Sequence, residues 1–123
     1  MRLVDTSAWI EWLTDSDVGR RVGDHLPAPE MCLVPTIVQM EVAKWSSRLD
    51  DETALERILA LMRTCNVVPL DTEIALAPAG ACRTHRLATA DAVVFATAQA
   101  HGADILTCDA HFAELPGVIF VPK

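Results

Sequence analysis

The segment Leu3-Val4-Asp5-Thr6-Ser7-Ala8-Trp9 decides the fold class. Its first two residues are apolar and predict a short buried strand that ends at Asp5. Trp9, Trp12 and Leu13 then recur at helical spacing, which predicts a helix over residues 6–13. A short apolar strand that runs directly into a helix is typical of proteins in which helices cover a parallel sheet.

The same alternation continues along the chain. Further apolar runs predict strands at residues 31–34, 66–70, 105–107 and 118–121. Helices are expected at residues 15–26, 35–49, 50–64, 71–86, 90–100 and 110–115, with a break at Pro78-Ala79-Gly80 and an N-cap at Thr89. This order predicts a three-layer α/β/α sandwich around a mostly parallel five-stranded sheet. With 123 residues and no visible linker or repeat, we expect a single domain over residues 1–123.

The composition excludes several classes of protein. The chain is 51% hydrophobic and 22% charged, which is typical of a globular protein and not of a disordered one. Its apolar runs are too short to span a membrane, and the N-terminus shows no signal-peptide pattern. We therefore expect a cytoplasmic protein that does not bind membranes.

The four cysteines are expected to be free thiols. Cys32, Cys65, Cys82 and Cys108 contain no C-x-x-C pair and lie in apolar or helical segments. Cys108 and His111 are three positions apart, but a zinc site needs about four converging ligands, and no others are suitably spaced. A structural zinc site is therefore not predicted.

The formal net charge of −7 argues at first against nucleic-acid binding, because affinity for phosphates depends on Lys and Arg. The total hides a distinction. If several of the acids form one metal site, the rest of the surface is much less acidic, and bound divalent ions reduce the deficit further. The charge therefore does not exclude a nucleic-acid substrate.

Two acids directly follow predicted strands. Asp5 ends the first strand, and Asp109 comes two residues after the fourth. Ligands of parallel sheets bind at the carboxyl ends of the strands, where loops lead into helices. Asp5 and Asp109 are therefore candidates for one site at that edge of the sheet.

Two further acids interrupt apolar helices. Glu41 has Ile37 four positions before it and Trp45 four positions after it, so it lies in an apolar stripe. Asp91 stands in the first turn of a helix that is apolar nearly all round, where the helix dipole favours its charged form. An isolated carboxylate on a buried face costs several kcal/mol unless it is compensated.

Taken one at a time, these acids have ordinary explanations. Asp5 could cap the following helix, Asp91 could be a first-turn charge, and Asp109 could be a turn residue. Glu41 could pair with Lys44 or reach the surface. Taken together, four carboxylates gathered at one sheet edge repel one another unless a cation neutralises them, and hard oxygen ligands favour Mg²⁺ or Mn²⁺.

Four segments carry a resemblance to a known family. They are Val4-Asp5-Thr6-Ser7-Ala8-Trp9, Pro35-Thr36-Ile37-Val38-Gln39-Met40-Glu41-Val42, Thr89-Ala90-Asp91-Ala92-Val93-Val94-Phe95-Ala96-Thr97-Ala98 and Leu106-Thr107-Cys108-Asp109-Ala110-His111-Phe112. In this order and spacing the chain resembles the PIN-domain ribonucleases, most closely the VapC-type toxins of type II toxin–antitoxin pairs. The resemblance covers essentially the whole chain.

The resemblance implies a site, a reaction and partners. Asp5, Glu41, Asp91 and Asp109 would be the catalytic, metal-binding quartet, with the hydroxyls of Thr6, Ser7 and Thr107 beside it. One or two Mg²⁺ or Mn²⁺ ions would support endoribonuclease cleavage that leaves a 5′-phosphate and a 3′-hydroxyl. The implied partners are RNA, a second copy of the chain in a homodimer, and a protein antitoxin that inserts an Arg or Lys into the acidic site.

The chain departs from the family pattern in two places. Some relatives carry a further acid two residues after the fourth one, whereas this chain has His111, so a five-acid site is not expected. The predicted break at Pro78-Ala79-Gly80 falls in a region that is usually helical in the family. That break leaves the local shape and the nearby interface undetermined.

The residues that would contact substrate are less well marked. Lys44, Arg48, Arg83 and Arg86 flank segments that carry the quartet, but ordinary surface charges give the same pattern. The three tryptophans, Trp9, Trp12 and Trp45, could stack on bases, although packing in the core or an interface is the favoured interpretation. We assign no catalytic role to His25, His85, His101 or His111.

Other function classes stay open at this point. An aspartate-based phosphoryl-transfer domain would suit Asp5 and Asp71, but it would need a second acid two residues after Asp5, where this chain has Ser7. A non-catalytic PIN-like interaction domain would keep the quartet as a metal or partner site. A DNA or flap nuclease fits the same fold, although the chain is short for extra substrate-gripping elements.

Overall fold

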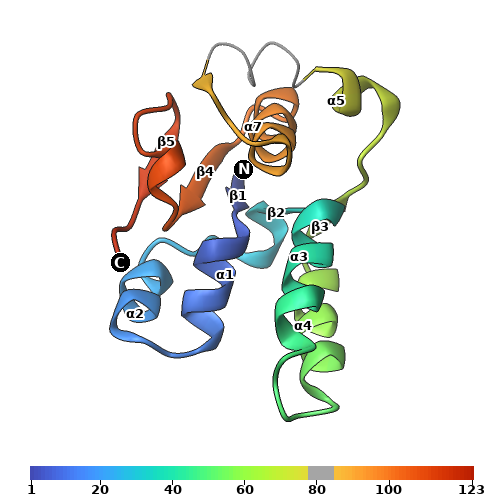
Figure 1. Ribbon diagram of the computed structural model, residues 1–123, viewed down its shortest axis with the longest axis vertical. Coiled ribbons are helices and arrows are strands. Elements are labelled where there is room, and N and C mark those ends of the chain that lie inside the picture. The colour runs from blue at the N-terminus through green and yellow to red at the C-terminus, as the bar shows by residue number, and fades with distance from the viewer. Residues whose placement is uncertain (78–84) are drawn as a thin grey trace.

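Five parallel strands form the centre of the computed structural model, which describes residues 1–77 and 85–123. They are β1 (Arg2–Val4), β2 (Cys32–Pro35), β3 (Asn66–Val68), β4 (Asp104–Thr107) and β5 (Val118–Phe120). Their order in the sheet is β3-β2-β1-β4-β5, and every neighbouring pair is parallel (Figure 1). The predicted five-stranded sheet is confirmed, and it is parallel throughout.

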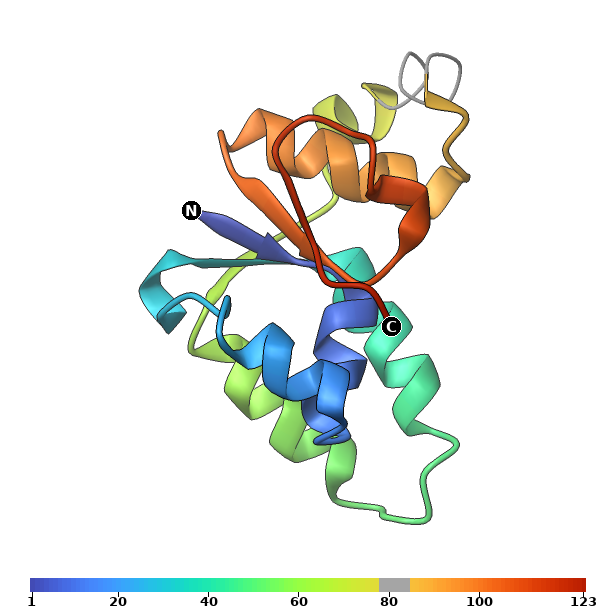
Figure 2. The ribbon, with the colours of Figure 1, turned by 90° about the vertical axis from the view of Figure 1, so that its left-hand side faces the viewer.

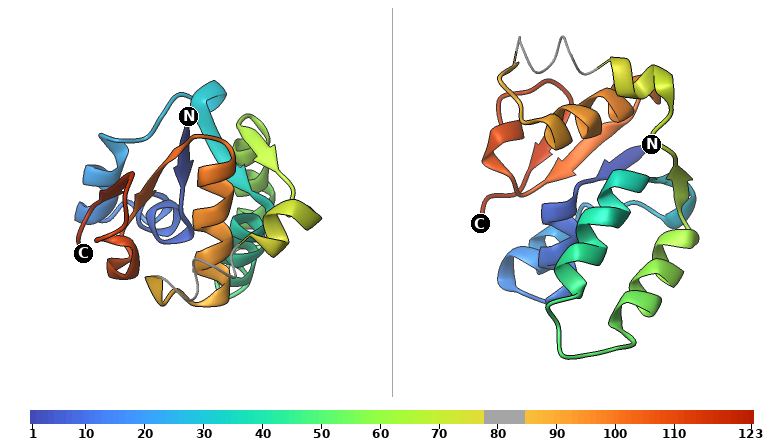
Figure 3. Two further views of the ribbon diagram at one scale, coloured as in Figure 1. Left: turned by 90° about the horizontal axis from the view of Figure 1, so that it is seen from above. Right: turned by 45° about the vertical axis from the view of Figure 1, so that its right-hand side comes forward.

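Helices cover both faces of this sheet. They are α1 (Thr6–Leu13), α2 (Asp17–Gly23), α3 (Thr36–Ser46), α4 (Ala54–Arg63), α5 (Thr72–Leu76) and α7 (Thr89–Ala100), with short 3₁₀ turns η1 (Pro29–Met31) and η2 (Ala110–Phe112). Helices α1 to α4 lie on one face, and α5 and α7 lie on the other (Figures 2 and 3). The three-layer α/β/α class is therefore confirmed. That residues 1–123 form one domain stays a prediction.

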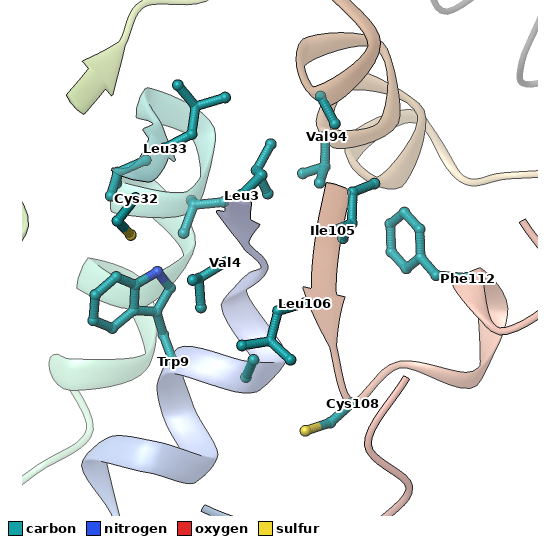
Figure 4. Close-up of a cluster of buried hydrophobic side chains, with 14 of the residues drawn as sticks. Leu3, Val4, Trp9, Cys32, Leu33, Val94, Ile105, Leu106, Cys108 and Phe112 are labelled. Atoms are coloured by element: carbon teal, nitrogen blue, oxygen red, sulfur yellow. The ribbon is translucent and has the colours of Figure 1, made fainter. Parts of the chain in front are cut away.

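The core lies where the central strands meet the helices on either side. Leu3 of β1 is aligned with Leu33 of β2 and with Ile105 of β4, and all three side chains are buried. Trp9 packs against this cluster from α1 and Phe112 packs against it from η2 (Figure 4). Strands buried on both faces are uniformly apolar instead of alternating, so these short runs could be recognised in the sequence.

The helix predicted to begin at Asp50 begins instead at Ala54. Asp51 is the reason, because its Oδ1 accepts hydrogen bonds from the backbone N of Thr53 at 3.0 Å and from Thr53 Oγ1 at 2.9 Å. Asp side chains that bond to the backbone two residues ahead form turns that compete with a helix. The acids here therefore shape a loop and do not form the first helical turn.

The predicted N-cap at Thr89 is also wrong by one residue. Ala88 is the extended residue before α7, and Thr89 is already helical. Leu87, immediately before it, is buried in the core. Thr89 therefore does not cap α7, which begins two residues after this buried side chain.

Other predicted boundaries differ by a few residues, as is usual at helix and strand ends. The helix expected over residues 35–49 ends at Ser46, and the one expected over residues 110–115 is only the 3₁₀ turn η2. In the stretch 71–86, α5 covers Thr72–Leu76, whereas the predicted break at Pro78-Ala79-Gly80 lies outside the described residues.

Two further predictions concern thiols and membranes. Cys32, Cys65 and Cys108 are free thiols as expected, and Cys82 lies outside the described residues. Across residues 1–77 and 85–123, none of the helices combines the length and the apolar character that a bilayer crossing requires.

Candidate metal-binding site

The strand order places two of the predicted acids side by side. Asp5 directly follows β1 and Asp109 lies two residues after β4, and Val4 of β1 is aligned with Leu106 of β4. The chain winds outward from β1 in one direction through β2 and β3, and in the other direction through β4 and β5. This reversal point is where open parallel sheets bind their ligands.

Two helices bring the remaining acids to the same place. Glu41 lies on α3, which follows β2, and Asp91 lies in the first turn of α7, which precedes β4. One pocket of about 250 Å³ is lined by Asp5, Thr6, Ser7, Ile10, Glu41, Asp91, Asp109 and Lys123. All four predicted carboxylates thus line a single pocket, although they are up to 104 positions apart in the sequence.

Asp5 is the most buried of these acids, with 5% of its surface exposed. Its Oδ2 accepts hydrogen bonds from Thr107 Oγ1 at 2.8 Å and from Ser7 Oγ at 3.0 Å. It stands at the N-cap position of α1, yet among the described residues its side chain makes no capping bond to that helix. The ordinary capping role therefore does not account for Asp5.

The environment of Asp5 disfavours its charge. The pKa of Asp5 is raised to about 6 in total: burial raises it most, the hydroxyls of Thr107 and Ser7 lower it, and the negative charge of Glu41 raises it. The hydrogen bonds from these hydroxyls stabilise the charged carboxylate by less than the loss of hydration destabilises it. A cation in the pocket would reverse this balance.

Hydroxyl groups connect the acids to one another. Thr107 Oγ1 also accepts a hydrogen bond from the backbone N of Asp109 at 3.0 Å, so one side chain holds both strand-end acids. Thr6 Oγ1 donates to Glu41 Oε1 at 2.9 Å. The three hydroxyl residues expected beside the quartet therefore lie there, and each hydrogen-bonds to one of its carboxylates or backbone groups.

Two of these acids, Asp91 and Asp109, also form a tighter group with His111, which lies beside the pocket and is not among its lining residues. Asp91, Asp109 and His111 each offer a potential ligand atom, and these atoms lie within 4.8 Å of one another. Burial raises the pKa of Asp91, the charges of Asp109 and Glu41 raise it further, and His111 lowers it. Here too, acids lie close enough to repel one another.

This donor set fits a divalent cation. Carboxylate and hydroxyl oxygens converge on one pocket, several of the acids disfavour each other's charge, and hard oxygen ligands are those that Mg²⁺ and Mn²⁺ prefer. Binding of an ion by Asp5, Glu41, Asp91 and Asp109 stays a prediction.

Three of the predicted substrate-binding cations, Lys44, Arg48 and Arg86, are not among the described residues that line this pocket. Lys44 is exposed on α3, Arg48 is exposed two residues after α3 ends, and Arg86 is exposed before α7. The fourth, Arg83, lies outside the described residues. Within residues 1–77 and 85–123, the cation that lines the pocket is Lys123, whose Nζ is 4.0 Å from Glu11 Oε1. The carboxyl-edge rule could have found it, because β5 ends at the same edge of the sheet as β1 and β4.

The tryptophans contribute to packing. Trp9 is 3% exposed and meets Trp12 edge to face, with ring centroids 5.9 Å apart. Trp12 and Trp45 pack against the core. The favoured interpretation of these residues, packing in place of base stacking, is therefore confirmed.

The sequence matches the PIN domain family over residues 2–118. The chain belongs to the PIN domain family. A comparison with curated protein sequences gives no match.

Solved structures show the same PIN fold at low sequence identity. A toxin–antitoxin complex from Klebsiella pneumoniae is similar with a TM-score of 0.85 and 22% identity, over 100% of this chain and 99% of that one. VapC20 from Mycobacterium tuberculosis, described as a sarcin-ricin loop cleaving toxin, is similar with a TM-score of 0.79 and 18% identity, over 99% and 100%. DNA-bound VapBC from Salmonella typhimurium is similar with a TM-score of 0.68 and 19% identity, over 97% and 95%.

Proposed function

We propose that this PIN-domain chain is a metal-dependent endoribonuclease and the toxin of a toxin–antitoxin pair. The observation that carries the proposal is the convergence of four carboxylates, from four distant segments, on one pocket. RNA is the proposed substrate because a similar structure, VapC20, is described as cleaving the sarcin-ricin loop. We place the protein in the cytoplasm, where such a substrate is available.

Each acid has a proposed role in holding one or two Mg²⁺ or Mn²⁺ ions. Asp5, Asp91 and Asp109 would be direct ligands, and Glu41 would bind directly or through water. When bound, such an ion lowers the pKa of a water molecule and stabilises a leaving oxygen, which are the two difficulties of phosphodiester hydrolysis.

Hydrogen bonds from neighbouring hydroxyl groups orient the carboxylates of Asp5 and Glu41. Thr107 and Ser7 both donate to Oδ2 of Asp5, so the orientation of that carboxylate is fixed before any ligand arrives. Thr6 holds Oε1 of Glu41 and leaves its other oxygen free of that bond. Outer partners of this kind fix the geometry and basicity of metal ligands.

An antitoxin would use the same pocket. The guanidinium of an arginine can neutralise clustered carboxylates and bind them through two parallel hydrogen bonds, so it can replace a metal ion. Similar structures are toxin–antitoxin complexes, which supports a protein partner of this type. A homodimer is part of the same proposal.

Cleavage of a labelled RNA tests the proposal. We expect cleavage with Mg²⁺ or Mn²⁺, no cleavage with EDTA, and a loss of at least about a hundredfold in Asp5→Asn and Asp109→Asn. Asp24→Asn, which changes an exposed acid that does not line the pocket, is the matched control and should cleave normally. Cleavage that survives EDTA or Asp5→Asn would overturn the proposal, and metal binding without any cleavage would favour a non-catalytic interaction domain.

The structure offers less support for an aspartate-based phosphoryl-transfer domain. Ser7 takes the position where that class needs a second acid, and it donates a hydrogen bond to Asp5. Asp71, the other residue in favour of that class, caps α5 by accepting a hydrogen bond from the backbone N of Ile74 at 2.9 Å. Asp71 therefore has a structural role that needs no phosphate.

A further inference from the structure

His111 belongs to the tightest group of potential metal ligands in the described part of the chain. Its ring nitrogen and the carboxylate oxygens of Asp91 and Asp109 lie within 4.8 Å of one another, and no other group of three acids, histidines or cysteines among residues 1–77 and 85–123 is as compact. Asp5 and Glu41 line the same pocket outside this group. No catalytic role is assigned to His111 from the sequence alone.

The position of the His111 ring is set by Asp109. The backbone N of His111 donates to Asp109 Oδ1 at 2.9 Å, and Nδ1 lies 2.7 Å from the same oxygen. These contacts hold an exposed side chain, with 78% of its surface accessible, beside two carboxylates. An exposed ring loses little hydration when it binds an ion, so its exposure does not oppose coordination.

The three ligand atoms lie close enough to share one ion. All of them are within 4.8 Å of one another, and Nδ1 of His111 is 2.7 Å from Asp109 Oδ1. Small side-chain rotations would bring all three to one cation.

We propose that His111 donates a ring nitrogen to a metal ion held by Asp91 and Asp109, and that this nitrogen makes the site select Mn²⁺ over Mg²⁺. The inference rests on the proposed function insofar as the same pocket holds the ion. Mg²⁺ prefers oxygen ligands and loses its water reluctantly, whereas imidazole suits transition metals. A histidine in place of an acid therefore shifts the preference without abolishing binding.

A purely structural role of His111 predicts something different. If the ring only orients Asp109 through the 2.7 Å contact, its removal weakens Mn²⁺ and Mg²⁺ binding alike, and no nitrogen is bound to the ion. The two roles are therefore separated by metal selectivity and by direct detection of nitrogen at the metal.

Pulsed electron paramagnetic resonance of Mn²⁺ bound to the protein without RNA provides the decisive readout. We expect ¹⁴N coupling in the wild-type protein and its loss in His111→Ala and His111→Asp. His25→Ala, which changes an exposed histidine outside the group of Asp91, Asp109 and His111, should keep the coupling. Absence of ¹⁴N coupling in the wild-type protein, or failure to bind Mn²⁺, would overturn the inference.

Calorimetric titration supplies the second measurement. The ratio of Mg²⁺ to Mn²⁺ dissociation constants should fall by about tenfold in His111→Asp, because an all-oxygen set replaces a mixed one. An unchanged ratio would contradict the proposed selectivity. Thermal unfolding of each variant shows that the substitution leaves the fold intact.

These measurements are independent of RNA cleavage. Nitrogen coupling in a protein that cleaves no RNA would overturn the proposed function and leave the role of His111 standing. Metal-dependent cleavage that is lost in Asp5→Asn, in a protein without nitrogen coupling, would support the function and overturn the role of His111.

Discussion

Asp5 is deeply buried, yet it must be ionised to bind a cation in the pocket. Because burial raises the pKa of Asp5 from 3.8 to about 6, the folded protein holds this proton more tightly than the unfolded chain does. This tighter binding of the proton stabilises the folded protein in full below about pH 4, and the stabilisation is lost as the pH rises through 6. In the metal-free protein, Asp5 therefore opposes folding at neutral pH.

We expect Asp5→Asn to gain stability relative to the wild-type protein as the pH rises from 4 to 7.5, by about 3 kcal/mol in total. The amide oxygen of asparagine can still accept the hydrogen bonds of Thr107 and Ser7. Urea unfolding in EDTA at a series of pH values measures the difference. A difference that does not change with pH would show that Asp5 titrates at an ordinary value.

Thr107 is the second residue whose loss should be felt in both stability and metal binding. It is fully buried, donates to Asp5 Oδ2 and accepts from the backbone N of Asp109. We expect Thr107→Val to lower the free energy of unfolding by about 1–3 kcal/mol, because the part-buried N–H of Asp109 loses its acceptor. It should also weaken metal binding, because Asp5 loses a bond that favours its charged form. Thr107→Ser keeps the hydroxyl and should restore metal affinity, as calorimetry can test.

The sequence identified some residues of this pocket and missed others for physical reasons. Asp5 and Asp109 follow strands, and Glu41 and Asp91 interrupt apolar helix faces, so each leaves a local signal in the pattern. Lys123 leaves only a weak signal: it follows the fifth predicted strand, and the strand order is needed to show that this strand ends at the same edge of the sheet as Asp5 and Asp109. Residue types show that a charge is out of place, whereas only the fold shows which charges meet.

At the scale of elements, the contact between α1 and α2 depends on one glycine. A Cβ at Gly19 would lie 2.0 Å from the backbone oxygen of Glu11, and a backbone atom inside a helix cannot move aside easily. We expect Gly19→Ala to destabilise the protein by about 3 kcal/mol or more.

The matched control is Gly23→Ala on the same helix. There the nearest atoms belong to the side chain of Trp12 at 3.7 Å, an ordinary contact, so the change should be neutral or mildly stabilising. Thermal unfolding of both variants measures the difference. Equal effects of the two substitutions would contradict the close approach of α1 and α2.

At the ends of helices, the residue types nearby do not always predict the boundary that the folded structure adopts. The run of acids at residues 50–52 suits a helix start, yet the turn formed by Asp51 delays α4 to Ala54. Thr89, which the local pattern suggests as an N-cap, is likewise already part of α7. Strands and helices that bury long apolar stretches were predictable, because their periodicity is set by the core and not by one side chain.

At the scale of the whole molecule, alternation of strands and helices predicts a parallel sheet but not its strand order. The pairing of β1 with β4 joins residues about a hundred positions apart, and nothing local in the sequence specifies it. That pairing creates the reversal point and brings Asp5 beside Asp109. The acidic site is therefore a product of the topology, and a ligand that binds there should stabilise the whole fold.

Metal binding should raise the stability of the protein, because the pocket joins β1, α3, α7 and the segment after β4. A ligand that binds only the folded state at a hundred times its dissociation constant adds about 2.7 kcal/mol, which corresponds to roughly 10 °C for a chain of this size. Neutralising the clustered carboxylates removes their repulsion as part of that gain. We expect the melting temperature to rise with Mn²⁺ in the wild-type protein and in Asp24→Asn, and to stay constant in Asp109→Asn. An equal rise in Asp109→Asn would mean that the ion binds elsewhere on this acidic chain.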